Sequence, residues 1–134
     1  MKLLFYFLLT SFSFISAAPD VTTQNVLYHS NKRTDTSIGL VTMDLNRILI
    51  KGKTKLEWQD GHSTVKYAFN IKSATGSLAL DNSGEITYQV SSEKVNGRFI
   101  VKKNNSVIKI NAILVAEGKP MIVDFEVGSY TVID

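Results

Sequence analysis

The dominant pattern along the chain after residue 20 is an alternation of apolar and polar residues with a period of two. The clearest example spans residues 64–72, where Val65, Tyr67, Phe69 and Ile71 share one face and polar residues occupy the other. This pattern is typical of a β-strand with one side on a core and one side in water. No window of ten or more residues holds a helical period between caps, so we expect at most one helical turn.

The same alternation continues to the end of the chain. Further strands are predicted around residues 54–58, 86–90, 99–101, 108–114 and 121–127. Asn, Asp and Gly residues separate them, and these residue types favour tight turns. The fold class is therefore all-β, with eight to ten antiparallel strands in a meander-rich barrel or sandwich. Hairpin-to-hairpin order favours the barrel, although the sequence leaves both architectures open.

Several parts of the chain are less regular. Residues 25–29 are predicted to form a short edge strand, and residues 30–36 a polar loop. Residues 37–45 are apolar on both faces in places, which indicates either a central strand covered on both sides or a strand whose phase switches at a bulge. Residues 47–51 show the same ambiguity. Gly128 is expected to shift the register of the last strand as a bulge or bend.

The amino terminus has the layout of an export signal. Lys2 precedes an apolar run over residues 3–15, and small residues follow it. The run is shorter than the roughly 20 residues of a membrane-spanning helix. With cleavage after Ala17, residues 1–17 are a signal peptide and residues 18–134 a single all-β domain without a membrane span. The protein is expected to be exported, either secreted or periplasmic.

Charge and cysteine content narrow the range of possible functions further. Removing Lys2 leaves 14 of the 15 basic side chains against 12 acidic ones, and the two signs are interspersed. Without a basic stripe, nucleic-acid binding is not expected. The chain has no cysteine, which excludes disulfides, thiolate metal sites and cysteine nucleophiles.

Candidate catalytic and metal-binding residues are few. His29 and His62 are the only histidines, and neither is followed by a ligand residue two or four positions further along the chain. Asp124 and Glu126 share one face of a predicted strand, where strand rise separates them by about 6 to 7 Å, a spacing compatible with a paired-carboxylate hydrolase. A solvent-facing strand surface explains the same pair, so we expect no enzyme activity, no metal and no cofactor.

Aromatic residues dominate the predicted inner faces. In a barrel they would line a pocket for an apolar ligand, whereas in a sandwich they would fill the core. The candidate ligand-binding residues are Trp58, Tyr67, Phe69, Tyr88, Phe99 and Phe125.

The favoured function is that of a non-catalytic binding module, which takes either an apolar small molecule inside a barrel or a protein or surface partner. The alternative is a structural or adhesion subunit that assembles through an exposed strand edge. Residues 106–115 are a candidate edge because only Lys109 is charged among them. The sequence leaves the oligomeric state open, and it leaves open whether Asn104, in an Asn-Asn-Ser sequon, is glycosylated.

One local resemblance concerns residues 62–67, His-Ser-Thr-Val-Lys-Tyr. They resemble the opening strand of the periplasmic isoprenoid-binding, lipocalin-shaped family. The similarity covers six residues and begins some 45 residues after the signal, so no membership and no site residue follow from it.

Overall fold

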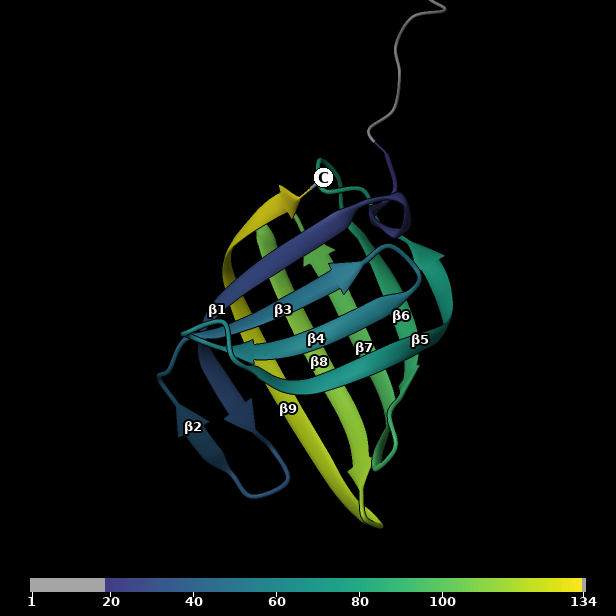
Figure 1. The fold of residues 1–134 in the computed structure, drawn as a ribbon. Coiled ribbons are helices and arrows are strands. Elements are labelled where there is room, and N and C mark those ends of the chain that lie inside the picture. The colour runs from purple at the N-terminus through teal and green to yellow at the C-terminus, as the bar shows by residue number, and fades with distance from the viewer. Residues whose placement is uncertain (1–18, 134) are drawn as a thin grey trace, which may run out of the picture.

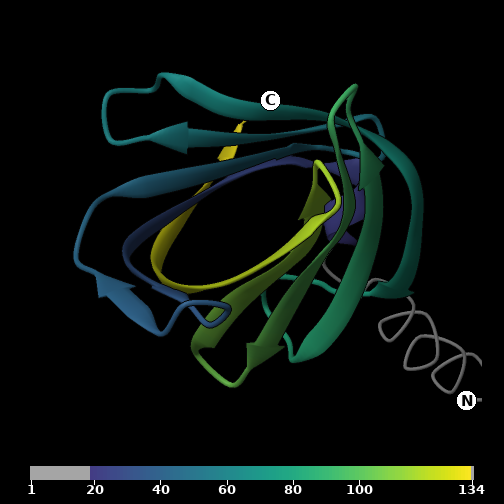
Figure 2. The ribbon, with the colours of Figure 1, turned by 90° about the horizontal axis from the view of Figure 1, so that it is seen from below.

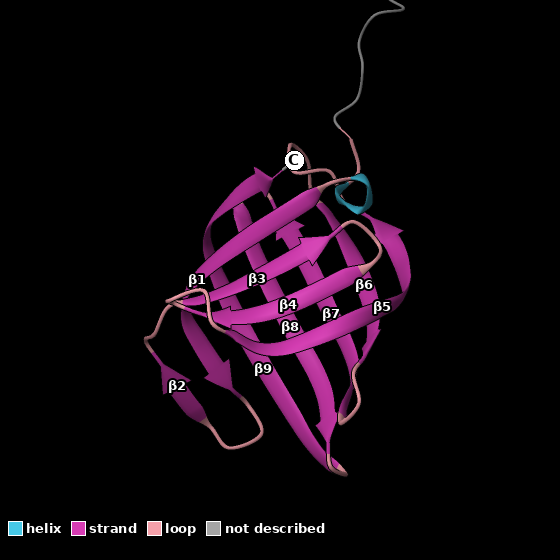
Figure 3. Ribbon diagram, viewed as in Figure 1, coloured by secondary structure: helices cyan, strands magenta, loops and turns pink. Residues whose placement is uncertain are grey.

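A computed structural model describes residues 19–133, which form one short 3₁₀ helix and nine strands (Figures 1 and 3). The predicted signal peptide, residues 1–17, lies outside the described residues. The all-β class and the predicted number of strands are confirmed. The elements are η2 (Val21–Thr23), β1 (Asn25–Asp35), β2 (Leu40–Thr42), β3 (Asn46–Lys51), β4 (Lys55–Asp60), β5 (Val65–Ser77), β6 (Gly84–Ser91), β7 (Val95–Asn104), β8 (Val107–Ala116) and β9 (Lys119–Ile133).

Eight of the strands close into an antiparallel barrel. β3 to β9 pair in chain order, β1 pairs with β3, and β9 returns to pair with β1. In Figure 1, β1, β3, β4 and β5 cross in front of β6 to β9, and Figure 2 shows the resulting ring from below. The β1–β9 pairing runs from Asn25↔Ile133 to Asp35↔Val123, and it decides between the barrel and the sandwich.

The structure corrects the interpretation of residues 25–36. Residues 25–29 are not an edge, because they pair with β3 on one side and β9 on the other. Residues 30–35 are not a loop but the second half of β1. Their polar composition favoured a loop, and that prediction was wrong. Two register shifts, between His29 and Ser30 and between Ser30 and Lys32, interrupt the alternation on which a strand prediction depends.

Residues 37–45 are neither a buried central strand nor a phase-switched one. Residues 36–45, here called the flap, form a hairpin extension that projects from one end of the barrel (Figure 2). Its strand β2 pairs only with the end of β1, through Thr34↔Val41 and its neighbours. The flap's large apolar side chains are exposed: Ile38 (70%), Leu40, Val41, Met43 (73%) and Leu45.

Strand pairing and burial settle three other expectations, which concern β8, β3 and Gly128. Residues 106–115 are not an exposed edge, because β8 pairs along its length with β7 and β9. In β3, Ile48 and Ile50 point inward and Leu49 is half-buried, so this strand has one buried face. Gly128 is the extra residue between His29↔Ser129 and Ser30↔Val127, so the predicted bulge is confirmed.

The end of the barrel opposite the flap is closed by the amino-terminal segment. Val21, in η2, and Leu78, after β5, are both buried there. The Asp20 carboxylate holds them together, since it accepts hydrogen bonds from the Thr22 N–H (3.0 Å) and the Leu78 N–H (2.9 Å). Burial of this carboxylate raises its pKa, but the hydrogen bonds from Thr22 and Leu78 outweigh that effect, so the pKa of Asp20 lies below its usual value.

Asp20 is therefore expected to stabilise the fold in a pH-dependent way. Its lowered pKa means that the stabilisation is complete above the unfolded-state pKa and is lost as the pH falls through the folded-state pKa. Asp20→Ala should lower the free energy of unfolding by about 1–2 kcal/mol at neutral pH, the usual cost of losing a cap. Urea unfolding of both proteins across the acidic range should show this difference shrinking. A difference independent of pH would contradict the assignment.

Candidate functional site

The largest of four surface hollows lies at the flap end of the barrel, and we call it the mouth. Its volume is about 700 Å³, within the range of about 300–1,000 Å³ typical of small-molecule sites. The walls come from β5, from the β6–β7 turn and from the β8–β9 turn. The lining residues are Lys66, Tyr67, Ala68, Asn70, Ser92, Glu93, Lys94, Val95, Ala116 and Glu117.

The mouth exists because β5 and β6 differ in length. β5 pairs with β4 from Val65 to Asn70, whereas its pairing with β6 begins only at Asn70↔Ser91. Residues 65–69 thus have a strand neighbour on one side and the mouth on the other. The β5–β6 pairing is absent over this stretch, although the ring of strands is closed from Asn70 onward.

A chain of aromatic rings leads from the mouth into the barrel. The Tyr67 ring lies 5.2 Å from that of Trp58 and 6.1 Å from that of Phe69, measured between centroids. Trp58 then contacts Phe125 edge-on at 5.0 Å, and Phe69 contacts Phe99 at 5.5 Å. The structure therefore joins five of the six candidate ligand-binding residues in one cluster. The sixth, Tyr88, lies opposite Phe99 on the neighbouring strand β6.

Five of the six candidate residues are buried, and Tyr67 alone is partly exposed. The exposed fraction is zero for Tyr88, Phe99 and Phe125, and at most 3% for Trp58 and Phe69. A side chain that bordered a water-sized void would carry accessible surface, so these rings fill the interior rather than line an empty pocket. Ligand binding by the six residues stays a prediction, and a ligand would meet Tyr67 first.

Polar contacts at the flap end hold the indole of Trp58 in place. Its Nε1 donates a buried hydrogen bond to Asn46 Oδ1 (2.9 Å), and Asn46 Nδ2 donates to Asp44 Oδ1 (3.0 Å). Arg33 Nε forms an ion pair with the same Asp44 oxygen at 3.3 Å. The cations of Arg33 and Lys66 lie 5.9 and 5.7 Å from the indole ring. These contacts fix one ring of the cluster and connect it to the base of the flap.

Sequence reasoning missed this polar group, although one signal pointed to it. Asn46 lies in the inward phase of its strand together with Ile48 and Ile50, and it is fully buried. A polar side chain on an inward face requires a buried partner. The only indole N–H in the chain, that of Trp58, was the natural candidate. Arg33 had no such signal, because its strand was interpreted as a loop.

Two tyrosine hydroxyls lie deep in the barrel. The hydroxyls of Tyr28 and Tyr88 are buried and have no hydrogen-bond partner among the described residues. Burial raises the pKa of both; the neighbouring Tyr88 and Tyr130 add to the effect at Tyr28, and Asp20 adds to it at Tyr88. Both phenols therefore remain neutral over the physiological pH range.

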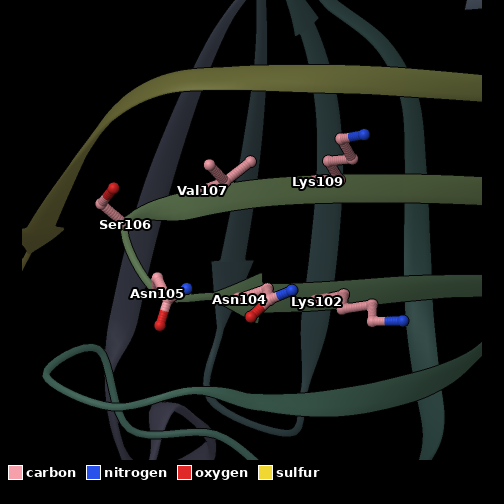
Figure 4. Close-up of a pocket in the computed structure, with 6 residues that line it drawn as sticks. All are labelled: Lys102, Asn104, Asn105, Ser106, Val107 and Lys109. Atoms are coloured by element: carbon pink, nitrogen blue, oxygen red, sulfur yellow. The ribbon is translucent and has the colours of Figure 1, made fainter.

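Three further hollows are smaller than the mouth. One of about 510 Å³ lies along the tip of the β7–β8 hairpin, where Lys102 and Lys109 extend from neighbouring strands (Figure 4). The sequon residue Asn104 is exposed there. Hollows of about 430 and 340 Å³ lie beside Tyr130 and on the outer face around Asn111. The mouth alone among the four is lined by Tyr67.

The candidate catalytic residues lie on the outer surface. Asp124 accepts a hydrogen bond from the Asn111 side chain, and Glu126 forms an ion pair with Lys32 at 3.5 Å. His62 is exposed in the β4–β5 turn, and His29 lies within β1. Within residues 19–133, no group of three or more His, Asp or Glu side chains is placed to hold a metal ion. The only helix in that range, η2, is a single turn and is too short to span a bilayer.

Comparisons with known proteins found no relative of this chain. No protein-family model, no curated protein sequence and no solved structure matches this chain.

Proposed function

We propose that this protein is an exported, non-catalytic binding module that takes an amphiphilic small molecule at the mouth. The export part of the proposal rests on the pattern of residues 1–17, and amino-terminal sequencing of the protein recovered outside the cytoplasm tests it. The binding part rests on the mouth. Its size suits a small ligand, and it is lined by Tyr67, the one residue of the aromatic cluster that is not buried.

Tyr67 is the single observation that carries the proposal. Tyr67 lines the mouth, and its ring contacts the rings of Trp58 and Phe69. A ring held in this way offers a rigid apolar surface and loses little conformational freedom when a ligand packs on it. Val95 and Ala116 extend the apolar floor from two other strands.

The charged side chains around the floor indicate what kind of ligand would fit. Lys66 and Lys94 carry positive charge on the rim, and Glu93 and Glu117 carry negative charge, so the rim is neutral overall. A ligand with an apolar body and a polar head would place the body on Tyr67 and the head among these side chains. The free backbone groups of residues 65–69 beside the mouth add hydrogen-bonding capacity for that head.

Removing the Tyr67 ring is expected to weaken binding about tenfold, because a ligand would lose its main apolar contact. The measurement is a titration with an anilinonaphthalene sulfonate probe, which combines an aromatic body with an anionic head. Trp58 is the only tryptophan of the chain and lies next to Tyr67, so quenching of its emission reports binding at this site. Tyr67→Ala should raise the dissociation constant accordingly.

Tyr130→Ala is the matched control, because Tyr130 is also a partly exposed tyrosine but lies by another hollow. Its dissociation constant should equal that of the wild type. Equal weakening by both substitutions, or a wild type in which no probe affects Trp58 emission, would reject the mouth as the binding site.

A further inference from the structure

The flap presents an exposed apolar surface that is separate from the mouth. Its apolar side chains have exposed fractions between 42% and 73%, which is unusual for so many in ten consecutive residues. They are anchored at the base, where Asp44 pairs with Arg33 and the Thr36 N–H donates to the Ile122 carbonyl oxygen (2.9 Å). The surface is therefore presented in a defined position rather than at random.

The flap also contains a strand that is paired on one side only. Among the described residues, β2 pairs with β1 and with nothing else. Exposed edges in soluble proteins are usually protected by charged residues, proline, a bulge or the shortness of the strand, and of these β2 has only the last, with three residues. Residues 36–43 contain no charged residue and no proline. An uncharged edge with apolar side chains is what a β-sheet interface requires.

We propose that a second copy of this chain covers the flap, with the two β2 strands paired antiparallel about a two-fold axis. Such an interface requires a self-complementary patch. With Val41 at the axis, Val41 faces its equivalent and Leu40 faces Thr42 of the other copy. No like charges oppose each other within β2, because the strand is uncharged.

The available area is consistent with a weak dimer. The five apolar side chains present on the order of 500 Å² per copy, so two copies would bury about 1,000 Å², near the lower limit of specific interfaces. A dimer of this size is expected to dissociate at roughly 1–100 µM. This inference does not depend on a ligand at the mouth.

Sedimentation velocity of the domain across this concentration range tests the proposal. The wild type should shift from monomer to dimer as its concentration rises. Val41→Lys places two positive charges at the axis and should weaken association at least about tenfold. Val107→Lys is the matched control, because Val107 is exposed to a similar extent (54% against 52%) but lies on β8 at the other end of the barrel. It should associate like the wild type.

Charge reversal gives a second, independent readout. A mixture of Val41→Lys and Val41→Glu proteins should recover the dimer that each lacks alone, since opposite charges then meet at the axis. Thermal unfolding of each variant checks that the barrel is intact. A wild type that stays monomeric throughout, or equal weakening by Val107→Lys, would overturn the proposal. So would a monomer that sediments with phosphatidylcholine vesicles through its flap, which would make a lipid surface the partner.

Discussion

Phe99→Ala is expected to lower the free energy of unfolding by about 3–5 kcal/mol, the cost of removing a buried aromatic ring from a packed core. Phe99 is fully buried, contacts Phe69, and lies between Tyr88 and Ala112 of the adjacent strands. Backbone hydrogen bonds hold the neighbouring strands in place, so the barrel has little freedom to collapse into the space left by the ring. Urea unfolding followed by Trp58 emission measures the loss. Since domains are stable by only about 5–15 kcal/mol, the variant should be marginal.

The same variant tests whether the interior is filled. A cavity left by the Phe99 ring would be apolar and should bind benzene, which would restore part of the lost stability by mass action. The wild type, with zero accessible surface on Phe99 and its neighbour Tyr88, should gain nothing from benzene. Benzene stabilisation of the wild type would show that the interior holds a cavity, and the lining residues would then include the six aromatic candidates.

Gly97→Ala is expected to lower the free energy of unfolding by about 2–4 kcal/mol, because both backbone strain and a steric clash oppose it. Gly97 has a φ of +151°, which residues with a side chain rarely adopt. A Cβ at this position would overlap the Ile113 carbonyl oxygen and lie 2.9 Å from Leu114 Cα. Because β7 is paired on both sides, it has no free direction in which to move.

Gly128→Ala is the control for this substitution. A Cβ at Gly128 would meet no atom within 4 Å, and its φ is not positive. Its effect should stay within about 0.5 kcal/mol. Urea unfolding compares the two variants, and amide hydrogen exchange should show that Gly97→Ala opens the β7–β8 ladder. Equal stability of the two variants would mean that the ladder absorbs the added methyl group.

The mouth could not be predicted from the sequence. It depends on β5 extending past the end of β6, and strand ends are set by pairing rather than by the alternation of a single strand. Tyr67 was identified as an inward residue, but its partial exposure follows from the missing neighbour on one side of β5. The Trp58–Asn46 hydrogen bond likewise joins residues twelve positions apart, on strands whose register had to be known first.

The flap illustrates the limit of hydrophobicity as a guide to burial. Residues 37–45 are as apolar as a core strand, so their sequence indicates either a strand covered on both sides or a strand whose phase switches at a bulge. Burial also requires an opposing surface, and in the barrel the inner face is already occupied by the other strands. The apolar residues of the flap are consequently exposed, and the polar second half of β1 forms a strand because β9 is there to pair with it.

By itself, the sequence determined the all-β class, the inward phase of most strands, the turn positions and the bulge at Gly128, because each depends on residues that are close in the chain. Only the tertiary structure decided that β9 closes onto β1, that β8 is internal, that the aromatic rings fill the barrel and that the flap is exposed. The closure depends on pairing between strands up to 108 residues apart, such as Asn25↔Ile133, and burial depends on which surfaces that closure brings together, so no local pattern encodes either.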